Sequence, residues 1–357
     1  MEVLKVVKAQ KSIWNDFVKK NGTLLQSWEW GEFKANFSWT PFRLAVVENG
    51  QWLLAASVLS KRMPMHRSFL YVPEGPIASF TIKKQITKSK NALRLIMAEI
   101  QEIAQRENAI FLRIEPFLPS LVSEKNPYCQ RSILAREINN LTALGFRKAF
   151  EDIQPRYRFW LDLKKSENEI WTGMRHKARY NIRLAQRKGV IIKEVVGIKM
   201  LDSFYSLYLE TAKRDGFSTR PKVYFLRLFE TMSQAGYVKM FMAYWHGHLL
   251  SSILVVFFGK YATYLYGATS SNHRELMPSY LIQWHAIRQA KKGGCHVYDF
   301  GAIAPSSEPH PWSGLREFKT KFQGVQVDFP GCFDLIYKPM WYCLFRLLER
   351  MRKKEHV

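Results

Sequence analysis

The chain has 357 residues, which is too long for one ordinary core and long enough for two domains of typical size. Hydrophobic residues make up 47% of it and aromatic residues 14%, a composition that excludes a mainly disordered protein. Lys and Arg number 54 against 30 Asp and Glu, so the formal net charge is +24. This excess predicts a polyanionic partner: a nucleic acid, an anionic membrane surface or a phosphorylated substrate.

Cysteine usage and hydropathy indicate a reducing compartment and no membrane span. The four cysteines, Cys129, Cys295, Cys332 and Cys343, form no CxxC pair, so neither a disulfide framework nor a Cys-based zinc site is expected. The nine histidines have no metal-ligand spacing, and no metal is expected. The N-terminus lacks the apolar core of a signal peptide, and the longest apolar run, Leu249–Phe258, is about half the length that crosses a bilayer. We therefore expect a cytoplasmic protein, with at most a peripheral contact to the inner membrane face.

The first part of the chain follows the order hairpin, strand, helix, strand. Phe42–Ser60 holds two β-rich runs around Asn49-Gly50, which is the strongest short hairpin signal. A strand-like piece over Ser68–Ile77, a long helical stretch over Thr81–Glu107 and a strand over Ala109–Pro116 come next.

The middle of the chain, Glu151–Lys239, contains a strand-like segment over Arg156–Leu163, a very basic helix and a second helical stretch over Met200–Arg214. The basic stretch is Ile170–Lys193. It has an apolar stripe at spacings of three and four, which predicts a buried helix face: Trp171, Met174, Ala178, Ile182 and Ala185. Its arginines are four apart and predict one exposed ridge, to which two lysines add: Arg175, Arg179, Arg183 and Arg187, with Lys177 and Lys188.

This ridge has two interpretations. Like charges at four-residue spacing destabilise a helix, so a sequence under no other demand would mix acidic residues into the ridge. A ridge of positive charge alone therefore favours a surface that binds a row of phosphates. The alternative is an ordinary solvated face. Gly189 is expected to end the helix.

The order hairpin, strand, helix, strand then occurs a second time. Met240–Phe258 is a second hairpin with its turn at His246-Gly247, and it is followed by a strand over Tyr261–Ser270, a helix over Pro278–Lys292 and a strand over Cys295–Pro305. Chance similarity of hairpins is the alternative, but four elements matching in order indicate a duplicated α/β domain. By fold analogy, the order also fits the acyltransferase fold best known from N-acetyltransferases (GNAT). The expected domains are 1–152 and 153–327, with a tail, about 328–357, that packs back on the first.

Five segments in sequence resemble one family. They are Gln26–Phe37, Arg175–Val190, Tyr264–Ser270, Tyr298–Pro305 and Gly314–Phe322. Together they resemble the Fem-type (FemABX) aminoacyltransferases that build the interpeptide bridges of peptidoglycan, and the similarity covers nearly the whole chain.

The resemblance implies two tandem GNAT-like domains, an aminoacyl-tRNA donor and a muramoyl-peptide precursor, UDP-linked or lipid-linked, as acceptor. The amine of the stem peptide would attack the ester of the charged tRNA. No cofactor, metal or ATP is implied, because the ester is already activated. The amino acid transferred, the acceptor's diamino acid and the oligomeric state stay open.

The resemblance also implies roles for particular residues. The family's Phe-Lys pair falls on Phe318 and Lys319, and Lys319 would stabilise the developing oxyanion. Acceptor binding is expected at Lys34, Arg220, Tyr224 and Tyr266, and tRNA binding at Arg175, Lys177, Arg179, Arg183 and Arg187. The alternatives are an ordinary surface position for Lys319 and core packing for the tyrosines. Glu115 and Asp299 end strands and could orient an amine or accept a proton, but ordinary turn or hydrogen-bonding roles are the favoured interpretation.

The sequence departs from the family in two places. The stretch Lys164–Asp202 is expected to hold one helix and a strand, which leaves no room for the long helical arm of many members. Ala302 replaces the second glycine of the family's YDFGG-like segment.

Two other functions compete with bridge formation. An acyl-CoA-dependent N-acyltransferase would need a glycine-rich pyrophosphate loop, and neither Gly75–Gln85 nor Ser271–Leu281 has that pattern. A non-catalytic nucleic-acid-binding protein would also explain the charge. A Fem-like protein acting on another polysaccharide is a variant of the same fold. The C-terminal segment Pro339–Val357 is basic and amphipathic, so it would lie either on an anionic membrane or against the first domain.

Overall fold

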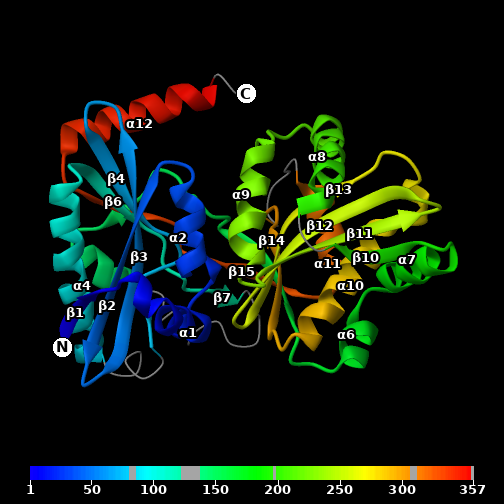
Figure 1. The fold of residues 1–357 in the computed structure, drawn as a ribbon, viewed down its shortest axis with the longest axis horizontal. Helices are drawn as coiled ribbons and strands as arrows, with labels where there is room; N and C mark the ends of the chain where they lie inside the picture. The colour runs from blue at the N-terminus through cyan, green and yellow to red at the C-terminus, as the bar shows by residue number, and fades with distance from the viewer. Residues whose placement is uncertain (80–85, 122–136, 196–197, 306–311, 355–357) are drawn as a thin grey trace. The chain divides into compact units, whose positions relative to one another are not determined.

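The structure is a computed structural model that describes residues 1–79, 86–121, 137–195, 198–305 and 312–354. Cys129 and the predicted start of the first long helix lie outside the described residues. The chain forms two compact units, one from Met1–Arg156 with Asp328–Val357 and one from Tyr157–Val327 (Figure 1). We refer to them as the first unit and the second unit.

The first unit is built on a mixed sheet with the strand order β1-β2-β3-β4-β6-β16-β8, and β5 pairs with β3. Its strands pair in antiparallel fashion except for β4 with β6, which are parallel. The strands are β1 (Glu2–Lys5), β2 (Trp39–Glu48), β3 (Gln51–Met63), β4 (Arg67–Val72), β5 (Ile77–Ala78), β6 (Ala109–Ile114), β8 (Arg147–Lys148) and β16 (Phe333–Ile336). The short strand β7 (Ser120–Leu121) also belongs to this stretch of chain.

Alternation along the strands gives this sheet two apolar faces. Leu70 and Leu112 pack with the buried side of α4 (Ile86–Arg106) in the main core. Phe69 and Phe111 point the other way and stack on each other at 5.2 Å, beneath α12 (Pro339–Lys354). The helices α1 (Lys11–Asn21) and α2 (Trp28–Ala35) come between β1 and β2 in the chain, and Ser27 caps α2 by accepting from the Trp30 N–H.

The C-terminal helix α12 is docked on the first unit by its aromatic residues. Phe345 lies 5.1 Å from Phe111 between ring centroids, and Tyr342 donates a hydrogen bond to Asp334 at 2.6 Å. Asp334 also accepts two hydrogen bonds from the Arg113 guanidinium, both 2.7 Å long. Of the two positions considered for this segment, the structure therefore contains the one against the first unit.

The second unit repeats the architecture, with the strand order β10-β11-β12-β13-β14-β9-β15. The strands are β9 (Tyr157–Asp162), β10 (Ile191–Val195), β11 (Val238–Trp245), β12 (His248–Phe258), β13 (Tyr261–Thr269), β14 (Val297–Ala302) and β15 (Val325–Asp328). The parallel pair is β13 with β14. One face is covered by α7 (His176–Arg187), α10 (Pro278–Lys292) and α11 (Ser313–Thr320), while α8 (Leu201–Asp215) and α9 (Lys222–Ser233) also pack on this sheet.

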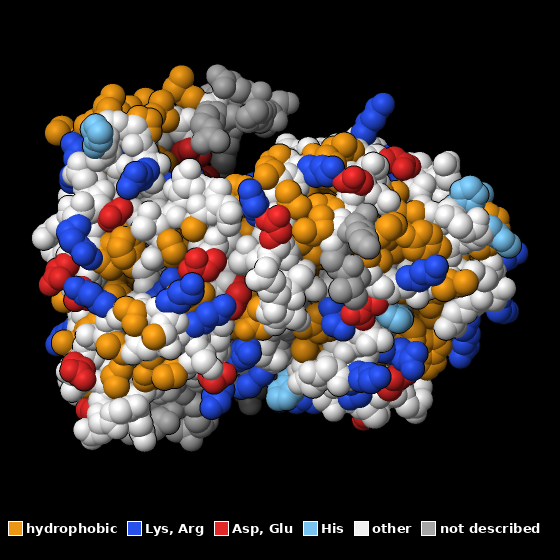
Figure 2. Space-filling model, in the orientation of Figure 1, with side chains coloured by type: hydrophobic (Ala, Val, Ile, Leu, Met, Phe, Trp, Pro, Cys, Tyr) orange, Lys and Arg blue, Asp and Glu red, His pale blue; other side chains and the backbone are white. Residues whose placement is uncertain are grey.

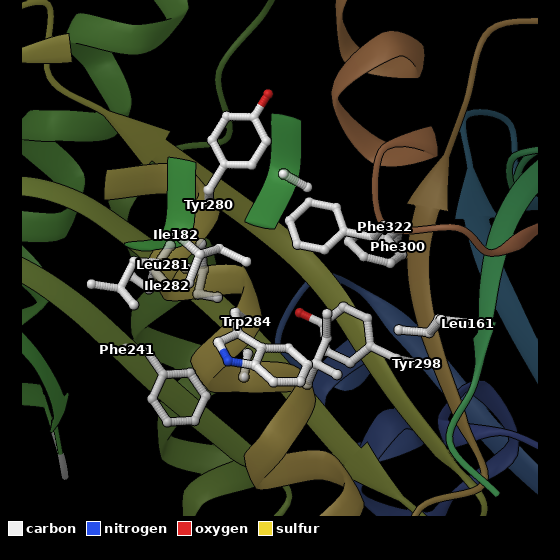
Figure 3. Close-up of a cluster of buried hydrophobic side chains, with 14 of the residues drawn as sticks. Leu161, Ile182, Phe241, Tyr280, Leu281, Ile282, Trp284, Tyr298, Phe300 and Phe322 are labelled. Carbon is white, nitrogen blue, oxygen red and sulfur yellow. The ribbon is translucent and has the colours of Figure 1, made fainter. Parts of the chain in front are cut away.

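The core of the second unit is aromatic where β14 passes beneath α10 and α11. Tyr298 and Phe300 alternate into it from β14, and Phe322 closes it from the end of α11 (Figure 3). The Tyr298 hydroxyl donates to Gln283 at 2.7 Å, so this buried polar atom is satisfied.

The predicted duplication is present in both units. The order β2-β3-β4-α4-β6 in the first corresponds to β11-β12-β13-α10-β14 in the second, and the last strand is parallel to its partner in each. Both hairpins turn through residues with positive φ: Asn49 (49°) with Gly50 (75°), and His246 (45°) with Gly247 (83°). These values suit the tight hairpin turns predicted from the two glycines.

The prediction of one continuous basic helix was wrong. The structure has two helices, α6 (Glu167–Gly173) and α7, because Met174 and Arg175 between them are extended, with ψ of 149° and 145°. The described part of Lys164–Asp202 therefore includes both of these helices as well as the strand β10. The apolar periodicity runs through the break because the extended Met174 is also buried, so spacing alone could not detect it. The predicted stop is confirmed: α7 ends at Arg187, and Gly189 has a φ of 80°.

Candidate functional site

The parallel strands of the second unit diverge before they end. Their register runs through the pairs Tyr261↔Val297, Ala262↔Tyr298 and Thr263↔Asp299 and stops there, although β13 and β14 continue. Two local irregularities coincide with the divergence: a register shift in β13 at Leu265, and Gly301, whose φ is 72°. The carboxyl ends of parallel strands are where open α/β sheets bind ligands.

Lys319 lies at this divergence. Phe318 and Phe322 anchor α11, and they contact Tyr280 at 5.0 Å and Phe300 at 5.2 Å between ring centroids. The side chain of Lys319 is only 3% exposed; its Nζ donates to the Ala302 carbonyl oxygen at 2.6 Å and lies 5.6 Å from the Tyr264 ring centroid. Its ammonium is thus held between the two diverging strands.

Burial controls the charge of this lysine. Desolvation lowers the pKa of Lys319 from 10.5 to about 8, and the nearby Asp299 carboxylate opposes that fall. Asp299 itself accepts from the Gly301 N–H at 2.7 Å and faces Arg158 at 3.5 Å. Lys319 is therefore a buried residue whose pKa lies close to neutral pH. Its burial excludes the ordinary surface position that the sequence had left open.

Tyr264 is a functional candidate that belongs to one of the sequence motifs but had no predicted role. Its side chain carries a pKa raised to about 12 by burial, so it stays a neutral phenol beside Lys319. A Cβ at Gly267 would overlap the Tyr264 hydroxyl, which explains the glycine in the Tyr264–Ser270 motif.

Three of the residues predicted to bind the acceptor lie together. The Tyr266 hydroxyl donates to the Tyr224 hydroxyl at 3.2 Å, and the Arg220 guanidinium lies 5.5 Å from the Tyr224 ring centroid. Tyr208 adds a third phenol, which accepts the Arg220 backbone N–H at 3.3 Å. Burial raises the pKa of Tyr224 well above its usual value, which keeps the hydroxyl protonated and able to donate.

The register shift in β13 separates these residues from Lys319 by one sheet thickness. Tyr264 pairs with Val255 and Tyr266 with Leu254, and neighbouring residues of a strand point to opposite faces. Tyr264 therefore faces α10 and α11 with Lys319, whereas Tyr266 faces α8 and α9. The two groups meet only where the parallel ladder ends.

The predicted basic ridge lies on the Lys319 side. Arg175, Lys177, Arg183 and Arg187 are exposed and Arg179 is half-buried, while Ala178, Ile182 and Ala185 face the core. The Arg183 guanidinium lies 5.3 Å from the Trp171 ring centroid. The Arg175 N–H donates to the Lys321 carbonyl oxygen at 3.0 Å, so the start of α7 is tied to the end of the helix that carries Lys319.

Lys34 belongs to the first unit, in the last turn of α2. It is half-buried, and its Nζ lies 5.0 Å from the Trp39 ring centroid and 6.0 Å from that of Trp30. The two indoles hold the ammonium by cation–π attraction. The structure therefore gives Lys34 an aromatic setting different from that of the second-unit residues.

The two strand-end acids have different surroundings. Glu115 is buried in the first unit, where it accepts from the Tyr71 hydroxyl at 2.5 Å and the Gln154 N–H at 2.9 Å, and burial raises its pKa. Asp299 lies beside Lys319. Among the described residues, no group of three or more His, Cys, Asp or Glu side chains is arranged to hold a metal ion.

Comparison with known proteins adds sequence and fold relationships. The model of the FemAB family matches residues 10–246 and 239–350. A "Lipid II:glycine glycyltransferase" of Staphylococcus haemolyticus (strain JCSC1435) is 24% identical over 414 aligned residues, which cover 95% of this chain and 93% of that protein. A solved structure described as FemX has a TM-score of 0.82 at 24% identity and covers 96% of this chain and 99% of its own. A tandem GNAT protein from the clavulanic acid biosynthesis pathway has a TM-score of 0.55 at 11% identity, with coverages of 94% and 98%. The predicted fold, two tandem GNAT-like domains, is confirmed.

The buried charge predicts an unusual stability effect. A pKa lowered from 10.5 to about 8 means that the charged Lys319 costs roughly 3 kcal/mol in the folded state. The unfolded chain binds the proton more tightly, so this penalty is complete below pH 8 and disappears as the pH rises to 10.5. We expect Lys319→Met to raise the free energy of unfolding by about 1–3 kcal/mol at pH 7, and by less at about pH 9.5, in urea titrations.

Lys321→Met is the matched control for that measurement. Lys321 is close by in the sequence, but its charge is paired with Glu317 at 2.7 Å, and that pair raises its pKa. This variant should gain no stability at pH 7. A Lys319→Met protein no more stable than the wild type at either pH would contradict the buried charge.

Proposed function

This chain belongs to the FemAB family and is a transferase, and from that premise we propose that it transfers an amino acid from an aminoacyl-tRNA to the stem-peptide amine of a lipid-linked muramoyl-peptide precursor. The proposal takes its reaction class and its lipid-linked acceptor from the relatives named Lipid II:glycine glycyltransferase. The UDP-linked form of the precursor is the alternative acceptor. The observation that carries the proposal is the buried ammonium of Lys319 at the end of the β13–β14 ladder.

The chemistry requires a cation at one point. The acceptor amine forms a bond to the ester carbonyl carbon, and the carbonyl oxygen becomes an oxyanion. The C–O bond to the terminal ribose then breaks, the ribose oxygen leaves with a proton, and an amide remains. We assign the Lys319 ammonium to the oxyanion: one of its three protons goes to Ala302, which fixes the Nζ, and among the described residues no other acceptor is seen for the remaining two, which we assign to the substrate.

The surroundings of Lys319 strengthen that role. A cation stabilises a developing negative charge more strongly where water is excluded. Phe318 packs on Tyr280 and Phe322, so we assign it to positioning its neighbour Lys319. Tyr264 supplies an apolar ring beneath the ammonium, with its hydroxyl kept neutral.

The two faces of the sheet offer separate approaches for two substrates. We assign the acceptor to the face of Arg220, Tyr224 and Tyr266, where a guanidinium beside phenol donors suits a diphosphate and a peptide carbonyl. Lys34, which Trp30 and Trp39 hold in the first unit, keeps the acceptor-binding role that the family resemblance implies for it. We assign the tRNA to the basic ridge of α7, which is bonded to the Lys319 helix through Arg175.

The start of α10 argues against an acyl-CoA donor. A pyrophosphate held at a helix N-terminus needs free N–H groups and close backbone approach. Here Pro278 occupies the first helical position and has no N–H, and the preceding Met277 carries its side chain at a φ of 54°. This helix start is poorly built for the pyrophosphate of CoA.

The test of the proposal is a transfer assay. Purified protein is incubated with a panel of charged tRNAs and with the lipid-linked or the UDP-linked precursor, and the stem peptide is analysed by mass spectrometry. We expect one added amino acid with the wild type, and at least a hundredfold loss of rate in Lys319→Met, because the loss of one oxyanion donor costs about 2.7–4 kcal/mol. Lys321→Met serves as control and should transfer normally. Transfer at the wild-type rate by Lys319→Met would remove Lys319 from the mechanism.

Acceptor binding is tested by a pair of arginines close together in the sequence. Arg220→Ala should raise the KM for the precursor about tenfold and leave kcat nearly unchanged, because the acceptor face then lacks a cation. Arg227→Ala on α9 removes an exposed arginine that is paired with Glu230 at 2.7 Å, and its KM should not change. Equal KM values in both variants would contradict the placement of the acceptor.

Donor binding is tested by charge reversal on the ridge. Arg179→Glu with Arg183→Glu should weaken aminoacyl-tRNA binding by tenfold or more and reduce the slope of log K against log salt by about two, one for each arginine that no longer neutralises a phosphate. The control is Arg94→Glu, an exposed arginine of α4. Filter binding across a salt series measures both effects. A slope unchanged by the double reversal would mean that the RNA binds elsewhere.

A further inference from the structure

The C-terminal helix has a second apolar face that docking does not use. At about 100° per residue, the aromatic side chains Trp341, Tyr342 and Phe345 lie on the side that contacts Phe69, Phe111 and Phe150. The outward side next to this docked face carries an aliphatic stripe: Met340, Leu344, Leu347, Leu348 and Met351. An ordinary surface helix would be polar on this side.

These five side chains are between 43% and 83% exposed. Figure 2 shows hydrophobic side chains gathered along the edge of the first unit where α12 runs. Their spacing of three and four residues places them within about 100° of the helix surface. Exposed apolar residues scattered singly need no explanation, but a contiguous stripe of this kind marks a surface that binds something.

The turn between β3 and β4 extends the stripe at its N-terminal end. Arg67, the first residue of β4 after that turn, lies with its guanidinium 4.6 Å from the Trp341 ring centroid, so the end of the turn is held against the start of α12. Met65 at the tip is 70% exposed and has a φ of 59°, and His66 beside it is also exposed. An exposed methionine at positive φ is not explained by packing.

The charges around the stripe are mainly positive. Arg350 is exposed and Lys338 and Arg67 are partly exposed, whereas the guanidinium of the partly exposed Arg346 lies over the Phe150 and Tyr342 rings on the docked side. The last turn of the helix reads Arg352, Lys353, Lys354 in the sequence. The acidic residues of the helix and its base are Glu349 and Asp334, and the Asp334 carboxylate is buried against Arg113 and Tyr342.

We propose that the outer face of α12, extended by Met65, binds the surface of an anionic lipid bilayer with the helix lying in the plane of the membrane. An aliphatic stripe bordered by cations matches the boundary between acyl chains and anionic headgroups. A protein partner is less well matched, because interface hot spots favour Trp, Tyr and Arg, and the aromatic residues of α12 face inward. Within the described part of the chain, no helix combines the length and the hydropathy that a membrane span needs.

The inference draws its purpose from the proposed function, since a lipid-linked acceptor has to be reached at a membrane, but its structural basis is the α12 face alone. A helix of 16 residues is about 24 Å long, so it can contact several headgroups at once.

The first experiment is sedimentation with vesicles of phosphatidylcholine, with and without about 30% phosphatidylglycerol. The stripe variant is Leu344→Ser with Leu347→Ser and Leu348→Ser; the control is Ile13→Ser with Ile191→Ser and Leu209→Ser, three other exposed apolar residues. We expect the wild type and the control to pellet with anionic vesicles, and the stripe variant to bind at least about tenfold more weakly. All three should keep the same circular dichroism spectrum.

The second experiment locates the contact. Cys343 is exposed at the edge of the stripe, and Cys295 and Cys332 are buried, so in a Cys129→Ser background Cys343 can carry an environment-sensitive fluorophore. Its emission should shift to the blue on anionic vesicles and be quenched by a quencher attached to the lipid chains. The same fluorophore at Leu209→Cys, with Cys343 replaced by serine, should not respond.

Three results would overturn the proposal. One is pelleting unchanged by the stripe variant but abolished by Arg179→Glu with Arg183→Glu, which would assign adhesion to the α7 ridge. Another is absence of pelleting by the wild type. The third is a dimer in light scattering that the stripe variant abolishes, which would assign the face to a second copy. Transfer assays with both the lipid-linked and the UDP-linked precursor separate the two proposals: pelleting without transfer to either precursor retains the membrane contact and rejects the enzyme assignment, and transfer without pelleting does the reverse.

Discussion

The ammonium of Lys319 is buried, and within the described part of the chain no carboxylate forms an ion pair with it. Its Nζ is held by a carbonyl oxygen and an aromatic ring, and Asp299 opposes but does not cancel the desolvation that lowers its pKa to about 8. A protein under no other demand would replace such a group with a hydrophobic residue, because a buried charge without a close counter-charge is costly. Strand geometry, the packing of α11 and the choice of Gly267 and Gly301 can all be understood as holding that charge where two strands diverge.

The divergence itself depends on a small irregularity. One extra residue in β13, Leu265, places Tyr264 and Tyr266 on opposite faces, and Gly301 bends β14 at the same level. A regular strand would have turned both tyrosines to one side and continued the ladder. The irregularity therefore makes the two faces of this sheet different. The face with Lys319 is continuous with the basic helix α7, and the face with Tyr266 is phenolic and is covered by α8 and α9. In the proposed reaction, each of the two substrates uses one of these faces.

The sequence was sufficient where local chemistry determines structure and insufficient where tertiary contacts do. The hairpins at Asn49-Gly50 and His246-Gly247 and the helix Pro278–Lys292 follow from turn residues and periodicity, and the structure contains them. The break at Met174 was missed because a buried residue can be extended and still satisfy a helical spacing. The burial of Lys319 was not predictable either, since its depth depends on Phe318 and Phe322 meeting rings from α10 and β14. Tyr264 was visible in a motif, but its contact with Lys319 depends on a register shift that no sequence pattern reveals.

The two units show how a duplicated sheet can keep its order and differ at its strand ends. In the first unit the parallel strands stay paired to the end: Val72 pairs with Ile114, and the Glu115 N–H then donates to the Val72 carbonyl oxygen at 3.1 Å. Glu115 fills the place beyond the ladder with a carboxyl group that Tyr71 and Gln154 satisfy. In the second unit the ladder stops at Thr263 and Asp299, and a lysine from a helix after the repeat enters instead. Among the described residues, the acid at the strand end of the first unit is satisfied internally, whereas the open end of the second unit holds a buried ammonium. The proposed chemistry is placed in the second unit because of this difference between the strand ends.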